Sequence, residues 1–242
     1  MTALSVNLNK IALLRNSRGR DYPSVVDFAN RFITLGVQGI TIHPRPDERH
    51  IKRQDAYDLA DFLKDHSQVE LNVEGYPNEE FLQLIDEIRP DQCTLVPDEE
   101  NQLTSDHGWD FREQGDFVHT VVSEIKAWGV RTAVFLDPDR EQVALAAKSG
   151  SHRIELYTEA YAQAWPTSDK DKVLAQYREV VLKAQELGLG VNAGHDLDLQ
   201  NLSAFLSIPG ILEVSIGHAL TTECIELGMD KIIGCYLDIT HA

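Results

Sequence analysis

A joint that recurs five times along the chain limits its possible folds more than any other feature. At each joint a helical pattern of apolar residues ends at a glycine, and within a few residues an apolar, β-branched segment begins. Glycine is favoured just past a helix because it adopts the left-handed conformation without steric cost. Such joints predict helices alternating with strands. The five glycines are Gly36, Gly129, Gly150, Gly188 and Gly210.

Short apolar segments follow these joints and recur elsewhere, which gives eight expected strands. Their near-continuous hydrophobic character is typical of parallel strands buried on both faces. The expected strands cover residues 4–8, 39–43, 69–74, 92–96, 131–136, 153–157, 190–193 and 212–216.

Between the strands, apolar residues recur at the spacing of one helix face, which predicts amphipathic helices. Ser24, Asn78 and Asp116 stand where their side chains would cap the first turns of three helices. The predicted apolar faces are Val25, Phe28, Ala29 and Phe32; Phe81, Leu84, Ile85 and Ile88; Phe117, Val118, Val121, Val122 and Ile125; and Val173, Tyr177, Val180, Ala184 and Leu187.

This alternation predicts an α/β protein, a (β/α)8 TIM barrel with additional helices, in which residues 1–242 form one domain. No linker rich in Ser, Gly or Pro divides the chain. An open doubly wound sheet of the Rossmann or flavodoxin type is the alternative. Gly188, Gly190 and Gly194 give it little support, because they flank a strand, whereas a dinucleotide fingerprint needs a strand-to-helix turn.

The formal net charge of −17 argues against a nucleic-acid or anionic-membrane partner. The positive charge is uneven, because residues 1–53 hold nine Lys and Arg against four Asp and Glu. This early segment is therefore expected to bind a small anion. The sequence shows no signal-peptide core or membrane span, and its three cysteines lack metal-ligand spacing, so a cytoplasmic protein is expected.

The segment GITIHPRPDERHI, residues 39–51, runs from an apolar strand into a loop that carries fixed positive charge. Its two prolines hold the backbone extended and cannot continue the sheet. Arg45, Arg49 and His50 would then form an anion clamp. The alternative is a solvated loop whose arginines form surface ion pairs.

Polar and titratable side chains follow most of the expected strands. In a (β/α)8 barrel, the carboxyl ends of the strands form the active-site mouth. Any one of these residues could be an ordinary surface residue, but their common position predicts one shared site. They are Asn7, Asn9, His43, Glu74, Asp137, Glu155, His195 and His218.

Gly-His pairs follow the last two expected strands, at Gly194–His195 and Gly217–His218. The loops after strands seven and eight, beside a helix N-terminus, often bind phosphate in this fold. Glycine there lets backbone N–H groups approach phosphate oxygens. The early cations could hold a second anionic group.

Taken together, these motifs resemble the pyridoxine 5′-phosphate synthase family of the deoxyxylulose-phosphate-dependent vitamin B6 pathway. The most specific are GITIHPRPDERHI, VNAGHDL (191–197) and EVSIGHAL (213–220). VNLNKIALLRNSRG (6–19), LNVEG (71–75), TLVPD (94–98) and RIELYTEAYA (153–162) also match. The resemblance runs in order along essentially the whole chain.

The resemblance implies a (β/α)8 barrel that assembles as a homo-octamer and uses no metal or organic cofactor. It implies condensation of two phosphorylated small molecules, 3-amino-2-oxopropyl phosphate and 1-deoxy-D-xylulose 5-phosphate, to pyridoxine 5′-phosphate, inorganic phosphate and water. Several proton transfers near neutral pH are needed, which suits histidines and a tuned glutamate. Two phosphorylated substrates also need two anion sites.

The resemblance further implies roles for residues in the matching motifs. His43 and Glu74 would accept protons, His195 would donate one, and Glu155 would stabilise a transition state. The aminoketone phosphate would be bound by Asn7, Asp196, Gly217 and His218. The deoxyxylulose phosphate would be bound by Asn9, Lys10, Arg18, Arg45, His50 and Thr104. Arg49 receives no role and is assigned to the surface.

Two departures from the family pattern bear on substrate binding. Many members have Asp-His where this chain has Asn9-Lys10, and Gly where it has Asp196. Lys10 can still pair with phosphate as a point charge. The Asp196 carboxylate would repel a phosphate unless only its backbone N–H faces the ligand.

Three rival functions compete with this interpretation. A metal-dependent sugar-phosphate isomerase or epimerase could use Glu74, Glu155, His195 and His218 as ligands of a divalent ion. A Schiff-base aldolase would need a strand-end lysine, for which Lys10 is the only candidate. A non-catalytic phosphometabolite-binding barrel is disfavoured by the intact set of proton-transfer residues.

Overall fold

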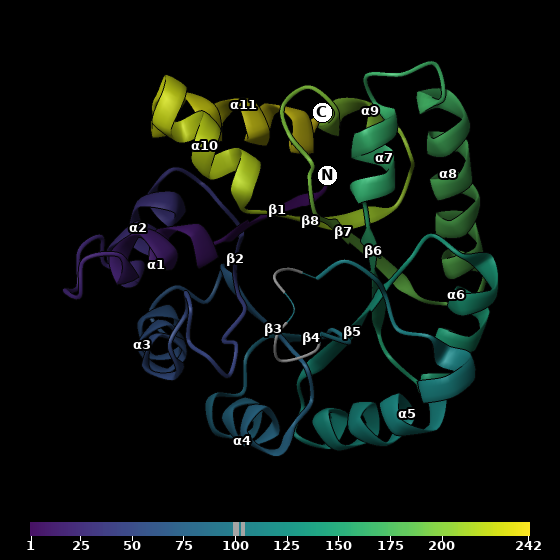
Figure 1. The fold of residues 1–242 in the computed structure, drawn as a ribbon, viewed down its shortest axis with the longest axis horizontal. Helices are drawn as coiled ribbons and strands as arrows, with labels where there is room; N and C mark the ends of the chain where they lie inside the picture. Colours follow the sequence, from purple (N-terminus) through teal and green to yellow (C-terminus); the bar gives the residue numbers. More distant parts are fainter. Residues whose placement is uncertain (99–101, 103–104) are drawn as a thin grey trace.

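The eight expected strands form one closed parallel barrel in the computed structural model, which describes residues 1–98, 102 and 105–242 (Figure 1). Each strand pairs with the next in sequence, and β8 returns to β1. The predicted strand positions are therefore confirmed to within one residue, and the open-sheet alternative is wrong. The strands are β1 (Ala3–Asn7), β2 (Gly39–Ile42), β3 (Glu70–Gly75), β4 (Gln92–Leu95), β5 (Arg131–Leu136), β6 (Arg153–Tyr157), β7 (Gly190–Gly194) and β8 (Ile211–Ile216).

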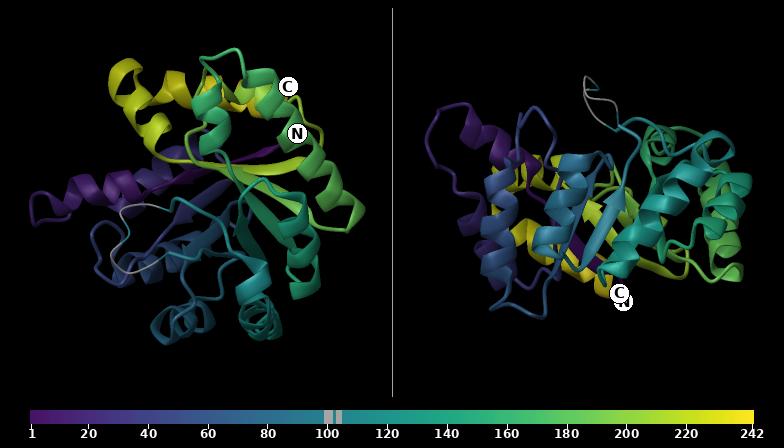
Figure 2. Two further views of the ribbon diagram at one scale, coloured as in Figure 1. Left: turned by 45° about the vertical axis from the view of Figure 1, so that its right-hand side comes forward. Right: turned by 90° about the horizontal axis from the view of Figure 1, so that it is seen from below.

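Helices surround the barrel, and two helices follow each of the strands β1, β6 and β8 (Figures 1 and 2). These are the additional helices that the sequence predicts. The helices are α1 (Asn9–Asn16), α2 (Val25–Thr34), α3 (Arg53–Leu63), α4 (Glu79–Ile88), α5 (Phe111–Ala127), α6 (Arg140–Ala146), the 3-10 turn η1 (Ala147–Ser149), α7 (Glu159–Ala164), α8 (Lys170–Glu186), α9 (Leu202–Phe205), α10 (His218–Leu227) and α11 (Met229–His241). Within the described ranges, no helix is both long and apolar enough to span a bilayer.

The glycine joints adopt the predicted conformation. All five glycines have positive φ, between 77° at Gly188 and 100° at Gly36. Two of the predicted caps are also confirmed, because Ser24 accepts a hydrogen bond from Asp27 N and Asn78 accepts one from Phe81 N.

The third predicted cap, Asp116, is wrong because α5 begins five residues earlier. Asp110 caps this helix and accepts from Arg112 N at 3.0 Å. Gln142, on α6, donates to Asp110 and accepts from Phe111 N, both at 2.8 Å. Such a contact between two helices leaves no local sequence signal.

Two residues assigned to buried helix faces lie at the surface. Phe117 is 42% exposed, and Leu187, just past α8, is 41% exposed. Phe117 stacks on the ring of Tyr76, with centroids 6.3 Å apart, and lies 6.1 Å from the Trp109 ring. Phe117 thus packs against one aromatic residue that follows β3 and one that precedes α5, and it remains partly exposed.

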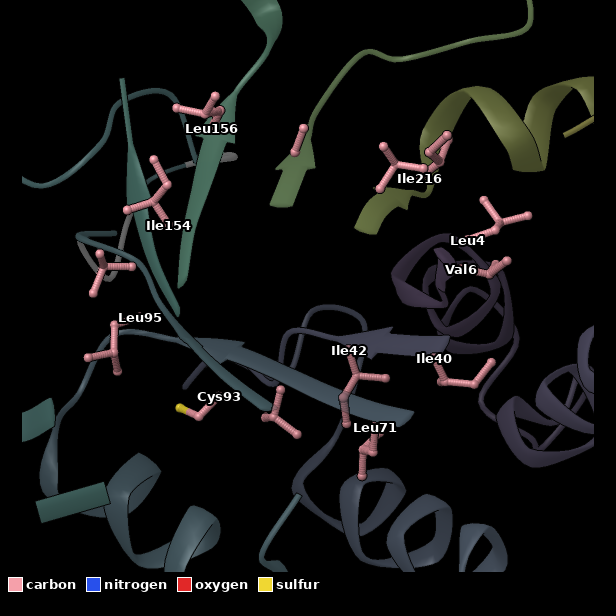
Figure 3. Close-up of a cluster of buried hydrophobic side chains, with 14 of the residues drawn as sticks. Leu4, Val6, Ile40, Ile42, Leu71, Cys93, Leu95, Ile154, Leu156 and Ile216 are labelled. Carbon is pink, nitrogen blue, oxygen red and sulfur yellow. The ribbon is translucent and has the colours of Figure 1, made fainter. Parts of the chain in front are cut away.

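Apolar side chains of the strands point outward and pack against the helices (Figure 3). Because side chains alternate along a strand, the intervening residues face the barrel axis. In many (β/α)8 barrels that interior is apolar; here most of it is polar. The strands therefore differ from the expectation of two apolar faces, and their inner faces carry Ser5, Asn7, Thr41, Asn72, Glu74, Gln92, Thr94, Glu155, Asn192 and Glu213.

Hydrogen bonds satisfy much of this polar interior. Across β1 to β4, the hydroxyls of Ser5 and Thr41 lie 2.7 Å apart, Asn72 donates to Thr41 at 3.3 Å, and Thr94 donates to Asn72 at 2.9 Å. Buried polar groups are tolerated when they are paired in this way. The interior is thus a hydrogen-bonded layer that leads up to the carboxyl ends of the strands.

Candidate active site at the carboxyl ends of the strands

Four titratable groups from four strands meet at the mouth of the barrel. Glu74 and Glu155 lie on β3 and β6, while His43 and His195 directly follow β2 and β7. The Nδ1 atom of His43 is 3.9 Å from Oε2 of Glu74, and Asn7 donates to the same oxygen at 3.5 Å. The structure therefore brings together residues that are far apart in sequence.

The two mouth carboxyls favour their neutral form. Burial, followed by the negative charge of Glu213, raises the pKa of Glu155 to about 8, although a hydrogen bond with Thr94 opposes this shift. Burial, followed by the charge of Glu155, also raises the pKa of Glu74. Oε2 of Glu155 has no hydrogen-bond partner among the described residues. A carboxyl whose pKa is raised in this way holds its proton to a higher pH and can give it to a substrate.

The two mouth histidines favour their neutral form as well. Burial, with the nearby Arg45, lowers the pKa of His43. Burial also lowers the pKa of His195, whose ring lies 5.2 Å from the Phe135 ring and 5.1 Å from the Tyr157 ring, centroid to centroid. Neutral imidazoles can accept protons, so the mouth pairs proton donors with proton acceptors.

The loop from β2 to α3 is more buried than a solvated loop would be. Arg45 is only 6% exposed and forms an ion pair with Asp98, and Ser105 donates to the same carboxylate at 2.7 Å. Arg45 also donates to the carbonyl of Gln102 at 3.1 Å. The alternative of exposed surface ion pairs is therefore wrong for Arg45.

Arg49 lies on the rim of the same loop and is partly buried. It donates to the carboxylate of Asp47 at 2.6 Å and to the carbonyl of Gln102 at 3.0 Å. These contacts place it beside Arg45 over the same carbonyl.

The ring of His50 has a defined hydrogen-bonding state. Its Nδ1 accepts from the backbone N–H of Ile51 at 2.9 Å. Burial, with the charges of Arg45 and Arg49, lowers the pKa of His50 to about 4. The ring is therefore neutral at physiological pH, and because Nδ1 is an acceptor, its proton sits on Nε2.

The turn after β7 is shaped around the Glu155 carboxyl. A Cβ atom on Gly194 would lie 2.5 Å from Oε1 of Glu155, so a larger residue there would displace this carboxyl. His195 and Asp196 both follow with positive φ, 77° and 56°, a conformation that non-glycine residues adopt mainly at turns and functional sites. Asn201 donates to the carbonyl of Asp196 at 3.0 Å and holds this turn. The Asp196 residue itself is exposed.

The turn after β8 leads directly into α10. Gly217 immediately precedes this helix, and a Cβ there would lie 3.0 Å from Cβ of Asn7. His218, the first residue of α10, is exposed. A helix N-terminus beside a glycine presents unpaired backbone N–H groups, which suit an anion.

Several predicted site residues are not drawn into this cluster. Lys10 and Arg18 are exposed, on α1 and on the loop that follows it. Asp137, at the end of β5, accepts from Gly108 N at 3.1 Å and anchors a loop. Thr104 lies outside the described residues. Asn9 joins the site differently, since its side-chain oxygen accepts from His43 N at 3.0 Å.

Sequence reasoning missed four charged residues that shape the site. Asp98 pairs with Arg45, Arg15 pairs with Asp55 under the β2–α3 loop, and Glu213 acts on Glu155 from within the barrel. The TLVPD motif already contains Asp98 at a strand end, and that position is a usable signal. The others become visible only when distant segments meet.

A cavity of about 530 Å³ opens beside the mouth. It is bounded by the β2–α3 loop and by residues near α4, including His43, Arg45, Asp98, Tyr76 and Phe81. The Gly194 and Gly217 turns lie outside it. This cavity therefore lies on the side of the mouth that carries the β2–α3 loop. Within the described part of the chain, no three His, Cys, Asp or Glu residues are arranged to hold a metal ion.

Comparisons with known proteins agree over the whole chain. A family model described as pyridoxal phosphate biosynthesis protein PdxJ matches residues 4–242. A pyridoxine 5′-phosphate synthase from Bacteroides fragilis is 49% identical over 98% of this chain and 98% of that protein. Another, from Christiangramia forsetii, is 48% identical over 99% of each. A mutant tryptophan synthase α-subunit from Pyrococcus furiosus has a TM-score of 0.65 at 12% identity, covering 100% of this chain and 98% of that one, which is a likeness of fold alone.

Proposed function

The chain belongs to the family of the pyridoxal phosphate biosynthesis protein PdxJ, and from this premise we propose that it condenses 3-amino-2-oxopropyl phosphate with 1-deoxy-D-xylulose 5-phosphate. The products are pyridoxine 5′-phosphate, inorganic phosphate and water. The observation that carries this function is the family match over residues 4–242. The cluster of neutral acids and neutral imidazoles at the mouth supports it, because the reaction needs repeated proton transfers.

The chemistry is assigned to His43, Glu74, Glu155 and His195. The aminoketone substrate brings an ammonium group, whose positive charge near the mouth lowers the pKa of Glu74 and converts that acid into a base. His43, 3.9 Å away, can exchange a proton with it. Glu155 keeps its proton and donates a hydrogen bond to developing negative charge, while His195 returns a proton to the leaving group.

The two phosphate groups are assigned to opposite sides of the mouth. Asn7, the backbone N–H of Asp196, Gly217 and His218 bind the aminoketone phosphate at the two glycine turns. This use of Asp196 is compatible with the family's glycine, since its side chain is exposed and its backbone is held by Asn201. The deoxyxylulose phosphate is bound by Asn9, Lys10, Arg18, Arg45, His50 and Thr104.

In the sugar-phosphate site, Arg45 and His50 do different work. The Arg45 guanidinium supplies fixed charge and has five N–H donors, so it can bind a phosphate while it keeps its contacts with Asp98 and Gln102. His50 supplies a neutral Nε2–H donor whose state does not change at physiological pH.

We assign the chain to the cytoplasm as a single-domain protein that assembles as a homo-octamer, with no nucleic-acid or membrane partner. Exposed apolar side chains on neighbouring helices α1 and α10, namely Leu13, Leu14, Ile225 and Leu227, support self-association. Sedimentation of the purified protein tests the assembly, with eight chains of 27.2 kDa expected.

One assay tests the function. Purified protein is mixed with both substrates, and pyridoxine 5′-phosphate is followed by its absorbance together with released phosphate. We expect stoichiometric formation of both products, and neither product with one substrate omitted. Absence of product with both substrates present contradicts the proposed function. Product formation that survives exhaustive chelation counts against the metal-dependent isomerase or epimerase alternative.

A further inference from the structure

We propose that the additional helix α1 is a platform that holds the β2–α3 loop in its ligand-binding shape, with Arg15 and Asn16 as positioning residues. The inference rests on the proposed function in one respect, because that function assigns the loop to the sugar phosphate. In a regular (β/α)8 barrel one helix follows β1. Here α2 occupies that place, and α1 is extra.

The last residue of α1 contacts the loop backbone through a single amide group. The side-chain nitrogen of Asn16 lies 3.3 Å from the carbonyl oxygen of Glu48, 3.1 Å from that of Arg49 and 2.8 Å from that of His50. Glu48 has a positive φ of 49°, which curls these three consecutive carbonyls toward one point. The N–H groups of one amide therefore serve the backbone carbonyls of a turn that belongs to neither a helix nor a sheet.

Arg15 fixes the direction of that amide. Its Nε donates to the side-chain oxygen of Asn16 at 3.1 Å, so the Asn16 nitrogen must face the loop. Its Nη2 donates to the carbonyl of His50 at 3.2 Å. The loop is thus held from α1 by two side chains that also hold each other.

A buried ion pair anchors this arrangement to α3. Arg15 is 5% exposed and forms a two-point ion pair with Asp55, with Nη2 to Oδ2 at 2.8 Å. Asp55 in turn accepts from Lys52 N at 2.7 Å, where the loop enters α3. A bidentate pair of this kind defines geometry as well as energy.

The first residue of α1 holds the other end of the loop. The side-chain oxygen of Asn9 accepts from His43 N at 3.0 Å, and Asn9 N donates to the side chain of Asn7 at 3.0 Å. The loop therefore runs along α1 and is tied at His43 and again at residues 48–50. Between these ties lies Arg45, and at the second tie lies His50.

This geometry makes the platform a device for positioning ligand donors. Preorganised donors lower the entropy cost of binding. Loss of the Asn16 contacts would free the 48–50 backbone and with it the ring of His50, while the mouth carboxyls on β3 and β6 would keep their places. Affinity for one substrate should then change with little change in the chemical step.

The test is the variant Asn16→Asp, which keeps the size of the side chain but replaces the donor nitrogen by an acceptor facing three carbonyl oxygens. Steady-state kinetics with both substrates are measured together with hydrogen–deuterium exchange of the backbone amides in residues 48–52. We expect the KM for the deoxyxylulose phosphate to rise about tenfold or more, with kcat and the KM for the aminoketone phosphate within about twofold of wild type. We also expect faster amide exchange in the loop.

Asn30→Asp on the exposed surface of α2 is the matched control. It adds the same charge to a neighbouring helix without touching the loop, and both readouts should stay at wild-type values. If Asn16→Asp folds poorly, Asn16→Ala is judged by the same two measurements.

The outcomes separate the two levels of inference. Unchanged loop exchange and an unchanged KM for the sugar phosphate overturn the platform. A fall in kcat together with a rise in both KM values also overturns it, since that combination indicates general damage to the protein. Faster loop exchange in a protein that makes no pyridoxine 5′-phosphate, even as wild type, would support the platform as structure and overturn its stated role together with the proposed function.

Discussion

At the amino-terminal end of the barrel, interior carboxylates face guanidinium groups, whereas at the carboxyl-terminal end they face each other. Arg131 lies 3.0 Å from Glu70, and Arg153 lies 3.1 Å from Glu213. At the mouth, the charge of Glu155 acts on Glu74, while Arg45, which also acts on Glu74, is engaged by Asp98. Both ends are polar, but among the described residues the mouth carboxyls Glu74 and Glu155 form no ion pair with an arginine or lysine.

The difference appears in the titration behaviour of the two ends. The hydrogen bonds from Arg131 lower the pKa of Glu70, while burial raises the pKa of Glu155 to about 8. Glu213 stands between these cases, because burial raises its pKa in spite of Arg153. The paired end serves to hold the barrel together, and the unpaired end keeps protons available for transfer at a cost in stability.

Glu74→Gln should have the largest effect on function. It removes the carboxyl to which we assign proton exchange but keeps the size and shape of the side chain. We expect kcat to fall by about 10²- to 10⁴-fold, with the KM values little changed and thermal stability equal to or above wild type. Steady-state kinetics and a thermal melt measure this.

Glu70→Gln is the matched control, because it makes the same substitution four residues earlier on the same strand. It should lower stability slightly and leave kcat within about twofold. Equal rates in wild type and Glu74→Gln would contradict the assignment of proton transfer to the mouth carboxyls.

Arg153→Met should have the largest effect on stability. It leaves Glu213 buried without its cation, and breaking a buried pair from one side costs about 3 kcal/mol or more. Arg131→Met is the milder counterpart, since its partner Glu70 is 47% exposed and can turn to water. Urea unfolding of both variants measures the difference, and similar losses for the two would contradict the paired-end interpretation.

The pH dependence of stability should be the smallest of the three effects. Between pH 6.5 and 8, Glu155 holds a proton in the native state that an unfolded glutamate has already lost, so unfolding releases protons. The free energy of unfolding therefore falls as pH rises, by up to about 1.4 kcal/mol per unit for one proton. The mouth histidines, whose native pKa values are lowered, act in the opposite sense near pH 6.5, where an unfolded histidine is still partly protonated.

Urea unfolding at pH 6.5 and at pH 8 measures this slope for wild type and for Glu155→Gln. We expect wild type to lose about 1–2 kcal/mol more than the variant across the window. If the free energy of unfolding of the variant changes with pH as much as that of wild type, Glu155 is not the source of the pH dependence.

The sequence predicted the strands because their outward faces carry a strong apolar pattern, and it predicted the mouth because strand ends share one edge of a barrel. It did not predict the polar interior, since residues such as Asn72 and Asn192 resemble interruptions of a strand until their partners are known. Motif resemblance supplied the roles of His43 and Glu155. Neither approach could find the pair of Arg15 with Asp55, whose members lie 40 residues apart and meet only after folding.

The chain ends lie together on the face opposite the mouth. The N–H of Thr2 donates to the carbonyl of Thr240 at 2.8 Å, beside the start of β1, and the two ends are adjacent in every view (Figures 1 and 2). A tag, a surface tether or a fused protein at either terminus would therefore leave substrate access open. A short peptide could also join the two ends, so that new termini could be cut elsewhere in the ring of helices while the barrel stays closed.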